Sequence, residues 1–297
     1  MSIELFRLQP IALISLLIGG LAMLMACALP AKHLTIRGES KTYEAGTIIS
    51  AELRRAVSFE QMVAGLSAVR VVYIGETHNR KDHHDLQLKL IQALHAVHPS
   101  TAVAMEMFDR SYQNVLDDWS AGRLSLEEFV RRTHWYANWR FDEKLYAPIL
   151  EYVKVNRLPL VALNLPFHIA GKIRVGGIEH LSAVEKGFLP KDIDTTQTSH
   201  REYAQEVFNQ HRFGGRTRFE DFYLAQCVWE DGMAEAVAAH RSLRPMVVLA
   251  GNGHIQYKYG IPERVRKRTG ETYRTVYPVS VGEQVDLNIA DYIWVME

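Results

Sequence analysis

This sequence has few cysteines, no net charge and no long apolar run. Its 297 residues include only two cysteines, Cys27 and Cys227. A chain of this length can bury a large core without disulfide bonds. Lys and Arg total 34, and so do Asp and Glu; without a basic excess, nucleic acid is not an expected partner. No low-complexity tract occurs, and with 47% hydrophobic residues the chain is expected to be globular.

One short apolar run lies near the start of the chain, from Ile11 to Met25. It is shorter than the roughly 20 apolar residues of a transmembrane helix and follows Arg7, which is typical of a secretory signal over residues 1–26. The segment Leu24-Met25-Ala26-Cys27 resembles the lipobox of bacterial lipoproteins. The resemblance implies cleavage before Cys27 and lipidation of its thiol. An uncleaved N-terminal anchor helix is the alternative.

The lipobox also bears on location. Residue 29 is Leu rather than Asp, which favours a lipid-anchored protein of the bacterial outer membrane that faces the periplasm. With Cys27 lipidated, Cys227 has no partner and is expected to be a small buried residue of a helix.

The remaining chain predicts a lipidated tether over residues 27–57 and an α/β domain over residues 58–297. Strands are expected at 69–74, 101–105, 160–164 and 246–250, and they alternate with helices. This alternation indicates a mainly parallel sheet flanked by helices. Helical insertions are expected at about 107–157 and 166–240, and the second forms a helical cap between strands three and four.

A short pattern occurs twice and is the most informative feature of the sequence. Apolar runs lead into Gly-x-x-His at Gly75–His78 and again at Gly251–His254. The carboxyl ends of parallel strands meet at one edge of a sheet, where α/β proteins bind ligands. Polar residues also follow the other two strands. We therefore expect one cleft that holds Glu76, His78, Glu106 and His254, with Asn164 as a supporting residue.

Two kinds of chemistry suit this set. His78, Glu106 and His254 are candidate ligands for a divalent metal such as Mn, Co or Zn. Alternatively, Glu76 and Glu106 orient the histidines as general bases without a metal. His84 and Gln87 share one face of the next helix and are expected to support the cleft. Two ordinary loop histidines are the plain alternative.

At this point the sequence resembles the ChaN family. The resemblance covers about residues 69–259 and rests on the two Gly-x-x-His motifs, on Asp82-His83-His84 with Gln87, and on the segment from Ala225 to Ala234. It implies a haem-binding lipoprotein of bacterial iron uptake, with ferric haem held between two monomers by a tyrosine ligand. An outer-membrane haem receptor is a possible further partner. Gln226 and Asp231 match the family motif and are expected to support the strand-end site.

The haem ligand is expected in the aromatic stretch between Trp135 and Tyr152. The portion from Trp139 to Pro148 resembles the family pattern, so Tyr146 is the first candidate, with Tyr136 and Tyr203 as alternatives. An aromatic stripe of this kind also suits a protein core. His168 and Lys172, one helical turn apart, are the first candidates for the haem propionates, and His200 with Arg201 is the alternative pair.

Two functional hypotheses follow. The first is a haem-binding protein without turnover. The second is a metal-dependent hydrolase, a peptidase or esterase, because the wider superfamily of Tiki metalloproteases and erythromycin esterases shares the paired Gly-x-x-His. A common fold is only an analogy for activity.

Overall fold

The structure is a computed structural model that describes residues 33–210 and 217–297. The predicted signal peptide, Cys27 and the start of the predicted tether lie outside these ranges. Within them, no helix combines the length and apolarity needed to cross a bilayer.

Eight strands form the main sheet, in the order β4-β3-β11-β9-β5-β8-β6-β7. The six from β11 to β7 are mutually parallel, and only β3 runs against them, pairing antiparallel with β11 on one side and β4 on the other. The predicted α/β class with a mainly parallel sheet is therefore confirmed. The strands are β3 (Ile48–Ser50), β4 (Arg55–Val57), β5 (Val71–Glu76), β6 (Ala102–Asp109), β7 (Leu160–Asn164), β8 (Met246–Gly251), β9 (Tyr273–Ser280) and β11 (Tyr292–Met296).

The first described strands belong to the domain and not to a tether. β1 (Leu34–Ile36) pairs with β2 (Thr42–Tyr43) and, in parallel, with β10 (Gln284–Val285). β3 pairs with β11, and the side chains of Leu34 and Ile49 are fully buried. The predicted boundary at residue 57 therefore differs from the structure. These strands are two or three residues long, and their partners lie at the other end of the chain, so no local pattern marks them.

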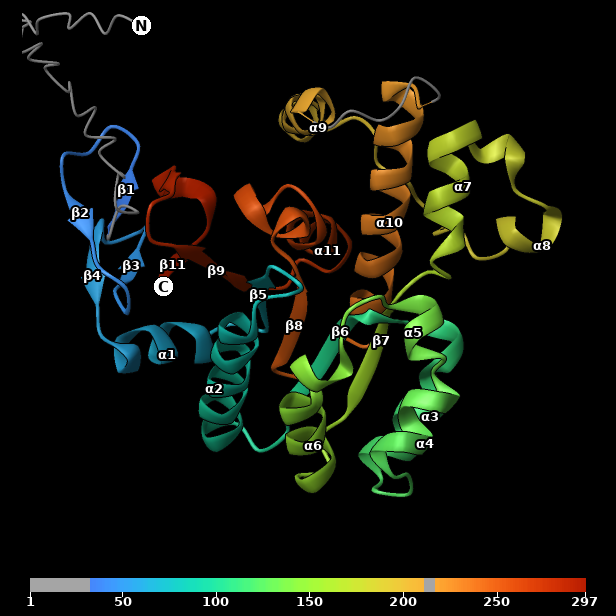
Figure 1. The fold of residues 1–297 in the computed structure, drawn as a ribbon, viewed down its shortest axis with the longest axis horizontal. Helices are drawn as coiled ribbons and strands as arrows, with labels where there is room; N and C mark the ends of the chain where they lie inside the picture. Colours follow the sequence, from blue (N-terminus) through green and yellow to red (C-terminus); the bar gives the residue numbers. More distant parts are fainter. Residues whose placement is uncertain (1–32, 211–216) are drawn as a thin grey trace, which may run out of the picture. The chain divides into compact units, whose positions relative to one another are not determined.

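Helices cover both faces of the sheet, as Figure 1 shows for α2 on one side and α10 on the other. Successive residues of β5 point to opposite faces: Val72 and Ile74 pack with α1 and α2, whereas Val71 and Tyr73 pack with α10 and α11. The helices are α1 (Phe59–Ser67), α2 (Lys81–Val97), α3 (Gln113–Ser120), α4 (Leu126–Arg132), α5 (Trp135–Asn138), α6 (Ala147–Val155), α7 (His168–Gly176), α8 (Ala183–Lys186), α9 (Thr198–Gln210), α10 (Phe219–Ala239) and α11 (Ile261–Thr269).

The expected cap between strands three and four corresponds to α7–α10. Of these, α10 packs on the sheet itself, because Met233 and Val237 join the core formed by β5, β6, β7 and β8. Capping boxes at Ser58 and Ser125 begin α1 and α4.

Within the first helical insertion, α6 begins at Ala147, after a 3-10 turn over Glu143–Leu145. Pro148 lacks a backbone N–H and occupies the first turn of α6. This start fixes Tyr146 at the N-terminus of the helix.

Strand order explains how distant residues meet. β8 lies between β5 and β6, and Glu76 at the end of β5 is in register with Gly251 at the end of β8. The carboxyl ends of the three strands are neighbours, which places Glu76, Glu106 and the segment 251–254 at one edge of the sheet.

Candidate functional site

A cavity of about 340 Å³ lies at this edge, between the strand ends and helices α9 and α10. Three of the predicted site residues line it, and the fourth, Glu106, adjoins it by accepting a hydrogen bond of 2.7 Å from the backbone N–H of Gly251. The structure thus brings together the ends of β5, β6 and β8. The lining includes Glu76, His78, His200, Tyr203, Phe222, Gln226 and His254.

Glu76 is the centre of the first cluster. Its Oε1 lies 2.8 Å from Nδ1 of His78 and accepts a hydrogen bond of 2.6 Å from the hydroxyl of Tyr146. Its Oε2 accepts one of 2.8 Å from Gln87 and lies 3.4 Å from Nε2 of His84. Burial alone would raise the pKa of Glu76, but the hydrogen bonds of His78 and His84 lower it to about 2. The carboxylate is ionised and orients His78 at the cavity wall.

Because Gly251 has no side chain, the imidazole of His78 can lie against the end of β8. A Cβ atom at residue 251 would lie 3.1 Å from Nε2 of His78 and 3.6 Å from Oε2 of Glu106. The side chains of His78 and Glu106 therefore both lie next to the backbone of Gly251, and a larger residue at this position would displace the imidazole of His78.

His254 lies between two buried carboxylates. Its Nδ1 is 3.2 Å from Oε1 of Glu230, and its Nε2 is 3.5 Å from Oε1 of Glu106. Burial alone would lower the pKa of His254, but the charges of Glu106 and Glu230 raise it to about 10. At neutral pH this side chain is therefore an imidazolium. Gln226 donates a hydrogen bond of 2.8 Å to Glu230 and so helps to hold this carboxylate.

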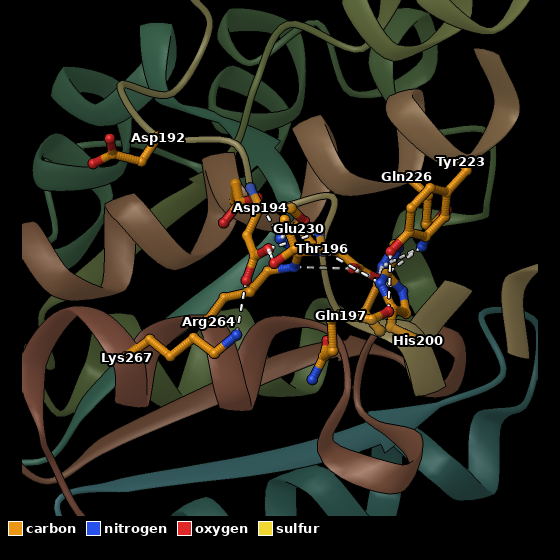
Figure 2. A network of polar contacts seen from close by, with 12 residues as sticks. Asp192, Asp194, Thr196, Gln197, His200, Tyr223, Gln226, Glu230, Arg264 and Lys267 are labelled. Atoms are coloured by element: carbon orange, nitrogen blue, oxygen red, sulfur yellow. Dashed lines mark hydrogen bonds and ion pairs between the residues drawn. The ribbon is translucent and has the colours of Figure 1, made fainter. Parts of the chain in front are cut away.

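A buried ionic network, drawn in Figure 2, reaches the cavity through His200. Nε of Arg264 lies 3.3 Å from Glu230, and another of its nitrogens pairs with Asp231. His200 is 3.2 Å from Glu230 and 3.2 Å from Arg264. The Glu230 charge raises the pKa of His200 to about 9, although burial alone would lower it. The network joins α9, α10 and α11 and holds α9 over the cavity.

Tyr146 does not fit the predicted ligand role. Its side chain is fully buried and packs against Trp135, Trp139 and His84. Burial and the adjacent Glu76 carboxylate hold the pKa of its hydroxyl well above the ordinary value. Because the hydroxyl is committed as a donor to Glu76, an iron ligand at this position would require the packing to open.

The first candidates for the propionates do not line the cavity, whereas His200 of the alternative pair does. Both His168 and Lys172 pair with Glu185, at 3.1 and 2.5 Å, so their charges already face a carboxylate. By contrast, the predicted supporting residues adjoin the site. Asn164 donates a hydrogen bond of 2.9 Å to the backbone carbonyl of Glu106, and Asp231 pairs with Arg264.

Tyr203 of α9 lines the cavity, which sets it apart from the other candidate tyrosines. Its hydroxyl oxygen accepts a hydrogen bond from the side-chain amide of Gln256. Its ring lies 6.1 Å from that of Tyr257 and 6.5 Å from that of Tyr259. Burial, with a contribution from Glu230, raises its pKa to about 12.

Arg264 is the functional neighbour that sequence reasoning missed. It lies on the buried face of α11 with Ile261 and Val265, at helical spacing. An arginine on an apolar helix face is the signal that points to a buried ion pair.

The predicted metal ligands meet around the cavity, where Glu106 pairs with His254 and His78 pairs with Glu76. Both ring nitrogens of His254 face carboxylates, Glu230 at 3.2 Å and Glu106 at 3.5 Å. Across residues 33–210 and 217–297, no group of three His, Cys, Asp or Glu side chains has a metal-holding arrangement.

Comparison with known proteins places this fold. ChaN of Campylobacter jejuni, solved with cofacial haem binding, shares it with a TM-score of 0.69, covering 83% of this chain and 95% of that chain at 20% identity. A mutant of erythromycin esterase in its open conformation has a TM-score of 0.46 at 15% identity, covering 79% of this chain and 77% of that one.

One curated relative is the chloroplastic protein RETICULATA-RELATED 5 of Arabidopsis thaliana, 23% identical over 257 residues and 76% of this chain. The chain spans about a third of the length of this relative, 34%. The family model described as "Haem-binding uptake, Tiki superfamily, ChaN" matches residues 62–265. The chain therefore belongs to the ChaN family of haem-binding uptake proteins.

Proposed function

We propose that this protein binds ferric haem in the strand-end cavity, with Tyr203 as the iron ligand. The observation that carries this proposal is the environment of the Tyr203 oxygen, which accepts a hydrogen bond from Gln256 at the cavity wall. A donor to the oxygen stabilises the phenolate form that binds iron. The oxygen of Tyr146, in contrast, donates to a carboxylate, which stabilises the neutral phenol.

The cavity offers a haem apolar surface beside the proposed iron ligand. Ala204 and Phe222 contribute apolar surface beside Tyr203, and the volume of about 340 Å³ lies within the range of small-molecule sites, about 300–1,000 Å³. Although the pKa of Tyr203 is raised to about 12, a ferric ion next to the oxygen offsets this by favouring the anion. A hard anionic oxygen suits ferric iron.

Haem binding is proposed to join two copies of the chain. A haem ligated on one face leaves the other face to be covered, and a second monomer can do this with the same surface patch. The cofacial haem binding of the Campylobacter jejuni ChaN supports this arrangement.

The proposed location is the periplasmic face of the outer membrane. Lipidation of Cys27 would anchor the chain, since several acyl chains bind a bilayer stably, and haem would be exchanged with an outer-membrane receptor. The lipobox at residues 24–27 supports the anchor.

Titration of the purified protein with hemin tests the proposal. Binding should give a shifted Soret band and the charge-transfer band of tyrosinate ligation, and sedimentation should move from monomer towards dimer. An unchanged hemin spectrum with the wild-type protein would reject haem binding.

A second candidate function is hydrolysis, favoured by the two histidine–glutamate pairs, Glu76 with His78 and Glu106 with His254. Peptide and ester substrates with Mn²⁺, Co²⁺ or Zn²⁺ test it, and His78→Ala should then abolish turnover. Metal-stimulated turnover that is lost in this variant would support the hydrolase.

A further inference from the structure

The chain enters the described domain beside the turn that follows β9. The backbone carbonyl of His33 accepts a hydrogen bond of 3.0 Å from the N–H of Gly282. This turn lies at the carboxyl ends of two strands of the main sheet, because the N–H of Val281, just after β9, donates to the carbonyl of Met296, the last residue of β11. The entry point of the chain is therefore at the carboxyl edge of the sheet.

The strand-end cavity belongs to the same edge. β9 lies next to β5 and parallel to it. Nδ2 of Asn252, a residue that lines the cavity, donates a hydrogen bond of 3.2 Å to the carbonyl of Pro278 on β9. Pro278 precedes Gly282 by four residues, which span at most about 14 Å. One short stretch of backbone therefore connects the cavity wall to the contact with His33.

A second line of contacts joins β1 to the cavity wall. Arg37, directly after β1, lies 3.4 Å from Asp286, and Asp286 accepts a hydrogen bond of 2.7 Å from the hydroxyl of Tyr257. The ring of Tyr257 lies 6.1 Å from the ring of Tyr203, which lines the cavity. Two separate sets of contacts thus place the entry of the chain beside the cavity.

We propose that a short lipid-anchored tether holds this edge of the domain, with the strand-end cavity, against the bilayer. The inference rests on the proposed lipidation of Cys27. The six peptide units from Cys27 to His33 span at most about 22 Å, and β9 rises about 23 Å from the amino edge of the sheet to the carboxyl edge. To bring the amino edge to the lipid, the tether would have to run fully extended along the whole sheet.

The partner of this edge is the phospholipid surface. Several acyl chains on one cysteine bind a bilayer stably, so the anchor keeps the domain at the surface. A ligand of the cavity then enters and leaves at the lipid surface, within reach of a membrane-embedded partner.

Fluorophores at three exposed positions test this orientation in the lipidated protein, bound to vesicles whose headgroups carry nitroxide quenchers. Because the Cys27 thiol would be acylated and Cys227 is buried, Gln284→Cys, Glu202→Cys and Ser242→Cys each supply an accessible thiol for labelling. Gln284 lies on β10 and Glu202 beside Tyr203 on α9, whereas Ser242 lies before β8 at the amino edge. The labels at residues 284 and 202 should lose most of their emission, and the label at residue 242 should retain it.

A lengthened tether is the matched control. Inserting about 20 Gly and Ser residues after residue 30 gives a flexible linker that adds ~25 Å on average, so the three labels should then be quenched to similar extents. Thermal unfolding followed by circular dichroism checks that each variant is folded.

Equal quenching at residues 202 and 242 with the natural tether, or stronger quenching at residue 242, would overturn the inference. A difference that persists with the lengthened tether would also overturn it, because the tether would then not set the orientation. Wild-type protein that does not float with the vesicles would reject the proposed lipid anchor and this inference with it, whereas the proposed haem binding is tested separately by the hemin titration.

Discussion

The hydroxyl of Tyr146 donates to Oε1 of Glu76 at 2.6 Å, and the same oxygen lies 2.8 Å from Nδ1 of His78. The tyrosine that resembles the family pattern is thus a buried support for a cavity histidine. The ring of Tyr146 packs in the core and its oxygen hydrogen-bonds to Glu76. Tyr203, in contrast, lines the cavity.

Tyr146→Phe should lower the free energy of unfolding by about 1.5–3 kcal/mol, because it removes a buried hydrogen bond to a charged group. The spectrum of bound hemin should remain unchanged. Urea denaturation measures the first effect and a hemin titration the second. Tyr136→Phe is the control, since Tyr136 is 59% exposed and the change should cost less than about 0.5 kcal/mol.

Arg264→Gln should destabilise the fold by about 3–5 kcal/mol, because it leaves Glu230 and Asp231 as buried charges without their main partner. The matched control is Arg266→Gln on the same helix, whose exposed pair with Glu263 contributes at most about 1 kcal/mol. Denaturant midpoints at constant m-value measure both changes. Equal losses in the two variants would contradict the central position of Arg264.

The free energy of unfolding should fall as the pH rises from about 6.5 to about 10. His254 has an ordinary pKa of 6.5 when unfolded and one raised to about 10 when folded, so across this window only the folded protein binds the proton. His200, raised to about 9, acts in the same direction. His254→Gln should reduce the slope without removing it. Urea titrations at several pH values measure the slope, and identical slopes would refute the raised pKa.

Cys27→Ser should abolish lipidation and release the protein from membranes without unfolding the domain, because the described fold begins after this residue. Mass spectrometry of membrane fractions should show an acylated N-terminal Cys27 peptide in the wild type. An unmodified Cys27 in a soluble wild-type protein would refute the anchor.

The sequence predicts the central architecture well where the signal is local. Buried runs such as 71–76 and 246–251 are long and apolar enough to identify as strands, and Gly75 and Gly251 mark their carboxyl ends. The convergence of Glu76, His78, Glu106 and His254 follows from parallel strands alone. Strand order determines which of them touch, and that order depends on long-range pairing that a single sequence does not display.

The predictions were weakest where a residue's role depends on its partner. The sequence alone does not distinguish the three candidate tyrosines, Tyr136, Tyr146 and Tyr203. They differ in the hydrogen-bond donors and acceptors around each hydroxyl oxygen. From sequence, Lys172 is likewise a reasonable partner for a ligand carboxylate. In the structure it pairs with Glu185 of the short helix α8, a contact that the sequence does not indicate. The short strands β3 and β4 lack enough residues for a period of two to emerge.

The most direct test of the account is the hemin spectrum of Tyr203→Phe beside that of Tyr146→Phe. Each substitution removes one oxygen and keeps the ring, so it distinguishes an iron ligand from a packing aromatic. The account predicts that Tyr203→Phe loses the tyrosinate charge-transfer band while Tyr146→Phe retains it. A band that persists in Tyr203→Phe and disappears in Tyr146→Phe would contradict it.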